Sequence, residues 1–407
     1  MGFGQGVSGI NAAAQNLDVI GNNIANSGTV GFKQSTATFA DVYAGSKVGL
    51  GVRVNSVVQS FTQGNIEASG RNLDVAITGG NGFFRLVDDA GQVYFSRNGQ
   101  MQRLDDGRLV NSSGLQVTGY PAGVQPGAGV APQPLVIANT QMPPKPTDEI
   151  IAQFNLDSRG TAPTTGFTTA AGNPPDAAMF NYSSTIEIFD SLGNAQQVTA
   201  YFVKGATDAT GTNWTMHVTD ANGAALTPAA GSAMRFDLNG NMVTPAAGTP
   251  VVINIPAANG AAAMAIDMNL AGTTQFGDDN DPKLLDQNGY SSGSLLGYTI
   301  QPDGSILGSF SNEETMNLGQ IVLATFGNVE GLQPEGDNVW TATGASGQPL
   351  LGAPGGSYGQ LQSNAVEASN VDLSGQLVNL IIAQRTYQAN AQTIQAQDQV
   401  LQTLVNI

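Results

Sequence analysis

Apolar residues recur every three or four positions at both ends of the chain, and no comparable run lies between them. Near the C-terminus this spacing extends from Leu373 to Val405, about four heptads, which is typical of an α-helix with a coiled-coil seam. The same spacing runs from Phe3 to Ile24 at the N-terminus. We therefore predict that the two terminal helices pair as a coiled-coil stalk.

The predicted seams also form the predicted assembly surface. The N-terminal seam consists of Phe3, Val7, Ile10, Ala14, Leu17 and Ile24, and the C-terminal seam of Leu373, Leu377, Leu380, Gln384, Tyr387, Ile394, Leu401 and Val405. Gly6, Gly9 and Gly21 each weaken the first helix by about 1 kcal/mol relative to alanine. The second helix is expected to begin at Asn370, after a capping box formed by Ser369 and Asp372. Two ordinary amphipathic helices of a globular core are the alternative.

The chain between the helices has the pattern of antiparallel β-structure. From about residue 71 the apolar period changes to two, as in Leu73, Val75 and Ile77. Turn signals follow at short intervals, at residues 88–91, 98–99, 105–107 and 111–114, with short apolar runs between them. This arrangement predicts a meander of short strands.

Two Pro- or Gly-marked stretches, at residues 142–146 and 282–292, indicate where the chain crosses between domains. The predicted domains are a terminal helical domain (1–27 and 368–407), an irregular connector (28–70), an inner β domain (71–145 and 286–367) and an outer β domain inserted into it (146–285). The predicted fold class is mainly β with terminal α-helices, in which the coiled-coil stalk is followed outward by two nested antiparallel β domains.

Composition narrows the possible partners. The net charge is −17, with 14 Lys and Arg among 407 residues, so nucleic acid and anionic membrane surfaces are not expected partners. Only 11% of residues are charged and none is cysteine. No apolar run reaches about 20 residues, so we expect no membrane insertion. The first basic residue is Lys33, so we expect no cleavable signal peptide.

The motifs that carry catalytic chemistry lack their required context. The Gly4–Gly9 segment fits a dinucleotide fingerprint but follows no strand. The Gly355–Gly359 segment fits a nucleophile elbow, yet the only histidine, His217, precedes it. The acidic run Asp278–Asp281 lacks the glycine and the closing glutamate of an EF-hand. We predict that the protein is not an enzyme and has no catalytic, cofactor-binding or metal-binding residues.

Two segments resemble the signatures of the bacterial flagellar rod and hook protein family. The first runs from Asn16 to Asn26 and continues in Gly31–Lys33, and the second covers residues 368–373 and 383–388. The residues that carry this resemblance are Asn22, Asn23, Asn26, Gly31, Phe32, Lys33, Asn370, Asp372 and Arg385. Residues 43–52, 82–87 and 336–340 are similar to the hook members of the family. The resemblance is weakest from about 150 to 280.

This resemblance implies a structural subunit of the flagellar hook, a flexible tubular universal joint that transmits torque from the rod to the filament. The implied partners are further copies of the chain, rod and hook–filament junction proteins, a hook cap and a length-control protein, and the flagellar type III export apparatus. The implied location is the hook on the basal body, outside the cell after export. A distal rod subunit of the same family, or a secreted β-rich enzyme or adhesin with helical ends, remains the alternative.

Overall fold

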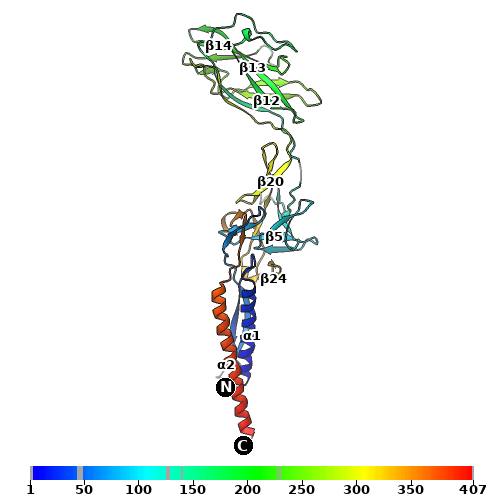
Figure 1. Cartoon of the computed structure of the whole chain (residues 1–407), viewed down its shortest axis with the longest axis vertical. Helices are drawn as coiled ribbons and strands as arrows, with labels where there is room; N and C mark the ends of the chain where they lie inside the picture. The colour runs from blue at the N-terminus through cyan, green and yellow to red at the C-terminus, as the bar shows by residue number, and fades with distance from the viewer. Residues whose placement is uncertain are drawn as a thin grey trace. The chain divides into compact units, whose positions relative to one another are not determined.

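The structure is a computed structural model, and it describes residues 3–43, 49–124, 129–138, 141–226, 228 and 231–405. Residues 44–48, part of the segment similar to hook proteins, lie outside the described residues, as do the side chains of residues 404 and 405. The helices are α1 (Phe3–Ala25) and α2 (Leu373–Val405), with short 3₁₀ turns η1 (Ala177–Met179), η2 (Val329–Gly331) and η3 (Gly356–Tyr358) (Figure 1).

The strands fall between the two helices in the sequence. Their bounds are β1 (Ser35–Asp41), β2 (Val52–Gln59), β3 (Ile66–Ala68), β4 (Val75–Thr78), β5 (Phe83–Val87), β6 (Val93–Ser96), β7 (Met101–Arg103), β8 (Leu109–Asn111), β9 (Gln116–Pro121), β10 (Gln133–Pro134), β11 (Glu149–Asn155), β12 (Tyr182–Phe189), β13 (Ala195–Asp208), β14 (Gly211–Asp220), β15 (Ser232–Phe236), β16 (Met242–Thr244), β17 (Val251–Ile255), β18 (Met264–Asn269), β19 (Asp281–Gln287), β20 (Leu295–Ile300), β21 (Ser305–Phe310), β22 (Thr315–Ile321), β23 (Leu323–Thr325), β24 (Gln333–Gly336), β25 (Val339–Thr341), β26 (Leu350–Gly352), β27 (Gln360–Ser363) and β28 (Ala365–Glu367).

The chain forms two compact units, each with its own hydrophobic core. Unit 1 comprises residues 1–139, 296–309 and 315–407, and unit 2 comprises residues 140–295 and 310–314. Unit 2 is therefore inserted into the sequence of unit 1. Where the chain enters and leaves unit 2, Lys145 and Tyr290 pair as an antiparallel bridge, as do Met142 and Gly293.

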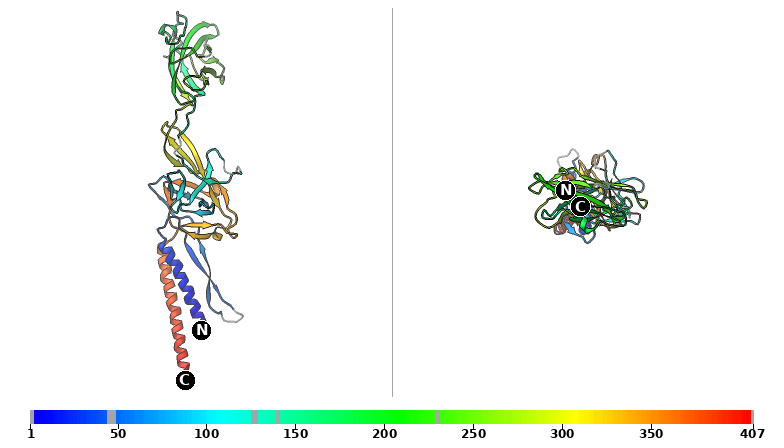
Figure 2. Two further views of the ribbon diagram at one scale, coloured as in Figure 1. Left: turned by 90° about the vertical axis from the view of Figure 1, so that its right-hand side faces the viewer. Right: turned by 90° about the horizontal axis from the view of Figure 1, so that it is seen from above.

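In unit 1 the two helices lie side by side and antiparallel (Figure 2). Small residues of α1 permit the close approach: a Cβ added at Gly6 would lie 2.8 Å from Ile394, and one at Gly9 would lie 2.7 Å from Asn390. The residues of α1 that are buried are Gly6, Gly9, Ala12, Ala13, Ile20 and Asn23. Gly6 and Gly9, two of the three glycines that weaken α1 as an isolated helix, therefore create its packing surface, whereas Gly21 is exposed.

The β part of unit 1 is built around one large sheet. Its main path runs β20-β21-β22-β9-β5-β6-β25-β24. On it Phe83, Phe95 and Trp340 are almost completely buried and pack edge-to-face with Phe61 and Phe326. Edge-to-face aromatic pairs of this kind contribute about 0.5–1.5 kcal/mol each beyond their burial. This aromatic cluster fixes the strands that carry one wall of the junction described below.

The prediction of an irregular connector over residues 28–70 is wrong. Strands β1 and β2 form an antiparallel hairpin, Ser35 pairing with Gln59 and Asp41 with Val52, and β3 pairs with β28. Among the described residues of β1 and β2 only Ala37 is buried. Because the hairpin buries so little, its sequence lacks the apolar alternation by which strands are recognised.

Unit 2 contains two mainly antiparallel β-sheets that pack around one shared hydrophobic core. One sheet has the order β12-β13-β14-β15-β16 and the other β17-β18-β11-β19. Their apolar alternation points inward, as in β17, where Val251, Ile253 and Ile255 are buried and the residues between them are exposed. Trp214, Phe154 and Phe202 are among the largest side chains in this core. Strands β12 and β13 form an antiparallel hairpin around residues 191–194.

The predicted fold class is confirmed: a mainly β chain carries one helix at each end, and the helices pair. The predicted start of the second helix is wrong by three residues. Helix α2 begins at Leu373, with the Asp372 carboxylate accepting a hydrogen bond from the Ser374 N–H at 3.1 Å. Asn370 lies before the helix, and its side chain is bound to Gln34 and Ser60, which directly flank β1 and β2.

We predict that a fragment covering residues 140–295 folds without the rest of the chain, because its core is closed by its own strands. The protein has two tryptophans, and this fragment keeps only Trp214, which is 1% exposed. Urea unfolding followed by Trp214 fluorescence should be cooperative, with a free energy of unfolding of about 5 kcal/mol or more. A gradual, non-cooperative change in emission would contradict this prediction.

Candidate functional site: the junction of the terminal segments

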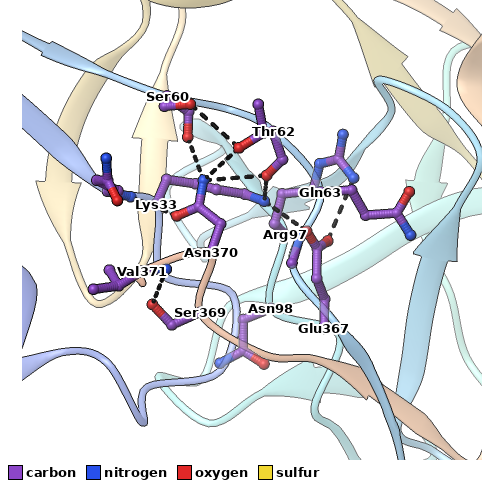
Figure 3. Close-up of polar contacts among 12 residues, drawn as sticks. Lys33, Ser60, Thr62, Gln63, Arg97, Asn98, Glu367, Ser369, Asn370 and Val371 are labelled. Carbon is purple, nitrogen blue, oxygen red and sulfur yellow. Dashed lines mark hydrogen bonds and ion pairs between the residues drawn. The ribbon is translucent and has the colours of Figure 1, made fainter. Parts of the chain in front are cut away.

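A buried ion cluster joins the segment after α1 to the segment before α2 (Figure 3). The Lys33 ammonium donates to the Glu367 carboxylate, Nζ to Oε1, at 2.5 Å, and both side chains are 0% exposed. Lys33 also donates to the Thr62 carbonyl oxygen at 2.7 Å. Burial lowers the pKa of Lys33, and the Glu367 carboxylate opposes this effect. The cluster is a link between residues separated by 334 positions.

Arg97 completes the cluster from the end of β6. Its Nη1 lies 3.4 Å from Glu367 Oε2, and its Nη2 donates to the Gly80 carbonyl oxygen at 3.0 Å. The guanidinium also lies over the Phe83 ring, 5.1 Å from the centroid. Glu367 Oε1 accepts a further hydrogen bond from the Gly64 N–H at 2.9 Å. Glu367 therefore sets one negative charge against two buried cations. The carbonyl oxygens of Thr62 and Gly80 accept further hydrogen bonds from these cations, whereas Arg97 Nε has no hydrogen-bond partner among the described residues.

Two asparagine side chains hold the C-terminal end of α1 and the segment before α2 in place. The Asn370 side chain accepts from the Gln34 N–H at 2.7 Å and donates to the Ser60 carbonyl oxygen at 2.8 Å. The Asn23 side chain, 1% exposed, accepts from the Ser35 N–H at 2.9 Å and donates to the Ser35 carbonyl oxygen at 2.7 Å. Asn23 thus pairs with β1 as a strand would, and it anchors the hairpin to α1.

The remaining signature residues have simpler roles. Gly31 has a φ of +74°, and a Cβ there would lie 2.7 Å from the Asn98 N atom, so this position requires glycine. Asn26 donates to the Asn22 carbonyl oxygen at 3.0 Å and closes the end of α1. Phe32 is half-buried, and Arg385 is exposed on α2. Of the nine signature residues, the junction brings together Asn23, Gly31, Lys33 and Asn370 directly.

The contact between α1 and α2 includes one predicted seam residue, Ile394, which lies opposite Gly6. The buried residues of α1 are Gly6, Gly9, Ala12, Ala13, Ile20 and Asn23, and the predicted seam did not include them. On α2 the buried positions are Gln376 and Ala383. The prediction followed large apolar side chains, whereas the α1 side of the close approach is formed by Gly6 and Gly9.

Many of the predicted seam residues are instead exposed. The exposed ones are Phe3 (52%), Val7 (38%), Leu373 (44%), Leu377 (46%), Gln384, Tyr387 (40%) and Leu401 (52%), while Ile10, Ala14, Leu17, Ile24, Leu380 and Ile394 are half-buried. The side chain of Val405 lies outside the described part. Three further apolar residues of α2 are exposed by half or more of their surface: Val378, Ile381 and Ile382. As an assembly surface, the seam therefore remains a prediction.

Sequence reasoning missed Glu367, Arg97 and Gln376. Glu367 directly precedes the C-terminal signature, and Arg97 directly precedes the turn at residues 98–99, within the segment 96–99 that is similar to hook proteins. In a chain with 11% charged residues, an acidic residue next to an apolar strand is a signal of a buried pair. Its partner cannot be identified from spacing, because Lys33 and Arg97 come from distant parts of the chain.

The junction supports cohesion between chain segments rather than chemistry. Among the residues that the structure describes there is no group of three or more His, Cys, Asp and Glu that could hold a metal ion. His217 lies in unit 2 and stacks on Phe167, with ring centroids 4.1 Å apart, and its burial lowers its pKa. No helix formed by the described residues is both long and apolar enough to cross a membrane.

Four family models match the chain, all from flagellar axial proteins. They are "Flagella basal body rod protein" over residues 5–33, "Flagellar hook protein FlgE/F/G D1 domain" over 76–161, "Flagellar basal body protein FlaE D2 domain" over 155–290 and "Flagellar basal body rod FlgEFG protein C-terminal" over 362–407. With paired terminal helices and an inserted β unit, the chain is a member of the flagellar rod and hook class.

Full-length relatives identify the family within this class. The chain is 48% identical over 413 residues to the flagellar hook protein FlgE of Salmonella typhimurium, and 47% identical over 412 residues to that of Escherichia coli, with 100% of both chains covered in each case. A 30% identical hook protein FlgE occurs in Treponema pallidum, covering 99% of this chain and 98% of the relative. The chain belongs to the flagellar hook protein FlgE family, which favours the hook over the distal rod.

A solved structure has the same fold at low identity. The crystal structure of Helicobacter pylori flagellar hook protein FlgE2 aligns with a TM-score of 0.53 and 13% identity, covering 74% of this chain and 100% of that chain. Its likeness concerns the fold alone.

We predict that Glu367→Gln destabilises unit 1 by about 3–5 kcal/mol, because two buried cations lose their counter-charge. Thermal unfolding followed by Trp340 fluorescence in a Trp214→Phe background measures the loss. Glu67→Gln, at an exposed glutamate on the neighbouring strand β3, is the matched control and should change stability by less than about 0.5 kcal/mol.

The loss in Glu367→Gln should shrink as the pH rises toward 10.5, the ordinary pKa of lysine. Without the carboxylate the folded-state pKa of Lys33 falls further, so the unfolded chain binds more protons than the folded one in this window, and stability increases with pH. A loss that is independent of pH would show that Lys33 is not the group left uncompensated.

Proposed function

We propose that the chain is a structural subunit of the flagellar hook, and that it polymerises into a flexible tube which transmits torque from rod to filament. The observation that carries the proposal is its 48% identity to a flagellar hook protein across the full length of both chains. The paired terminal helices, which expose apolar residues, supply a physical basis for assembly.

The exposed face of α2 is the strongest assembly surface among the described residues. Leu377, Ile381 and Ile382 are 46%, 50% and 57% exposed on a helix whose other face is occupied by α1. Complete burial of such a side chain contributes about 1.5–3 kcal/mol. A tubular polymer requires contacts between different surfaces of neighbouring copies, because only such contacts continue without closing. We propose that the exposed seam residues of α2, such as Leu377, belong to this surface.

The domains are proposed to have distinct roles in the tube. The terminal helices form its inner layer, and the β units of the chain form the outer contacts with neighbours. With 11% charged residues, these surfaces hold few ion pairs that would fix one arrangement. Sliding of the β units against neighbouring copies then lets the tube bend. This role needs no catalytic group, and we propose that the protein is not an enzyme.

The other proposed partners follow from the hook family. They are rod and hook–filament junction proteins at the two ends of the tube, and a hook cap and a length-control protein during assembly. We propose export by the flagellar type III apparatus without a cleavable signal peptide, and location in the hook outside the cell. The net charge of −17 argues against nucleic acid as a partner.

Electron microscopy of the concentrated, purified chain tests the proposed function. We expect curved tubes in negative stain, because a hook subunit carries the contacts needed for a bent polymer. Straight tubes would favour a distal rod subunit, and a chain that stays monomeric under all conditions would overturn the proposal.

We predict that Leu377→Asp abolishes tube formation and leaves the thermal unfolding of the monomer unchanged. The residue is 46% exposed in the single chain, so the charge is solvated there, but assembly would bury it without a partner. Leu238→Asp, the same substitution at a 74% exposed leucine of unit 2, is the control and should still form tubes. Tubes formed at normal yield by Leu377→Asp would exclude this face from the assembly contact.

A further inference from the structure

Unit 1 contains an uncharged groove along its terminal helices. It has a volume of ≈ 790 Å³ and lies between α1, α2 and the β1–β2 hairpin. Ala12 and Ile20 of α1, Phe39 of β1 and Ile382 of α2 supply its apolar walls, and Asn379 and Thr386 lie on its α2 side. Within the described residues no Asp, Glu, Lys or Arg lines it. Phe39 and Ile382 are 46% and 57% exposed, so the single chain leaves the groove open.

The last turns of α2 extend beyond α1. Gly6 faces Ile394 and Gly9 faces Asn390, so the antiparallel register places the first residue of α1, Phe3, beside about residue 397. Figure 2 shows α2 continuing past the start of α1. In this part Val400 and Leu401 are 61% and 52% exposed. The segment from Gln399 to Ile407, QVLQTLVNI, has no charged residue. We call residues 399–405 the α2 tail.

We propose that the α2 tail of one copy docks in the groove of a neighbouring copy. This inference rests on the proposed function, and it names the contact that joins successive subunits.

The two surfaces are complementary in charge and size. The groove has no charged lining residue and residues 399–405 have no charged side chain, so little charge is desolvated when they meet; the nearest charge along α2 is Asp398, whose carboxylate accepts a hydrogen bond from Gln402 at 3.0 Å. Two turns of helix with a diameter of about 10 Å and a length of about 11 Å occupy roughly 850 Å³. The groove volume of ≈ 790 Å³ matches this segment. Amide side chains in the groove, such as Asn379, can pair with the glutamines of the tail.

The contact is heterologous, and this gives it a functional consequence. The groove and the tail are different surfaces of one chain, so every copy that accepts a tail still presents its own tail to another copy. Such contacts produce an open polymer when the rotation between successive copies does not close into a ring. A contact of the exposed face of α2 with the same face of a second copy would instead end at a dimer.

Paired cysteines test the contact, because the chain has no cysteine of its own. The variant Asn379→Cys/Leu401→Cys places one thiol in the groove and one on the tail. These positions are 22 residues apart on one helix, about 33 Å at 1.5 Å per residue, so a disulfide within one chain cannot form. The variant is assembled into tubes, oxidised and separated by size without reductant. We expect a ladder of covalent oligomers.

The control is Gln388→Cys/Leu401→Cys, which moves the first thiol to the opposite face of α2, outside the groove. It should form tubes but no ladder, and each single cysteine variant should remain without a ladder. Unchanged thermal unfolding of the monomers checks that the variants fold.

The outcomes separate this inference from the proposed function. Tubes without a ladder in Asn379→Cys/Leu401→Cys, or a ladder of equal intensity in the control, overturn the docking contact and leave the hook function standing. Cross-linking that stops at dimers also overturns it, because the contact is then not open. Absence of tubes from the unmodified chain, with no ladder from the variant, overturns both.

Discussion

Two cations and one carboxylate buried together hold the beginning and the end of this chain in one place. Lys33, Arg97 and Glu367 are almost fully removed from water, and removal of single charges from water costs several kcal/mol each. That cost is offset only when the three side chains and the carbonyl oxygens of Thr62 and Gly80 are all assembled. The cluster therefore permits one arrangement of the segments that lead into α1 and α2. Helices that leave from a fixed root must run side by side.

The contact between the helices depends on small side chains. Gly6 and Gly9 bring the backbone of α1 against Ile394 and Asn390, at distances that leave no room for a Cβ. This packing consumes little apolar surface, since glycine and alanine supply most of the α1 side of the contact. The larger apolar side chains of α2, including Leu377 and Ile381, remain outside it. In a chain of the flagellar hook family, we propose that these exposed apolar side chains form contacts with further copies.

Unit 2 is organised on a different principle. Its sheets alternate apolar and polar residues and close one core around Trp214, Phe154 and Phe202. No residue of that core comes from unit 1. Its stability is consequently separable from that of the junction, and its sequence is free to vary as long as the alternation persists. The part of the chain from 150 to 280, where the family resemblance was weakest, falls in this unit.

The local pattern of the sequence was sufficient to determine the two terminal helices and the mainly β fold, because helices and strands bury residues at a fixed period. The signature residues Asn23, Gly31, Lys33 and Asn370 were also recognisable, and they lie at the junction. Tertiary structure alone decided which side chains meet there, since Glu367 and Arg97 reach Lys33 from distant segments. It also decided the hairpin β1–β2, which buries too little to leave an apolar pattern. On the α1 side, the closest approach to α2 lies at Gly6 and Gly9, which a pattern of apolar residues does not reveal, because the absence of a side chain, and not apolar area, permits it.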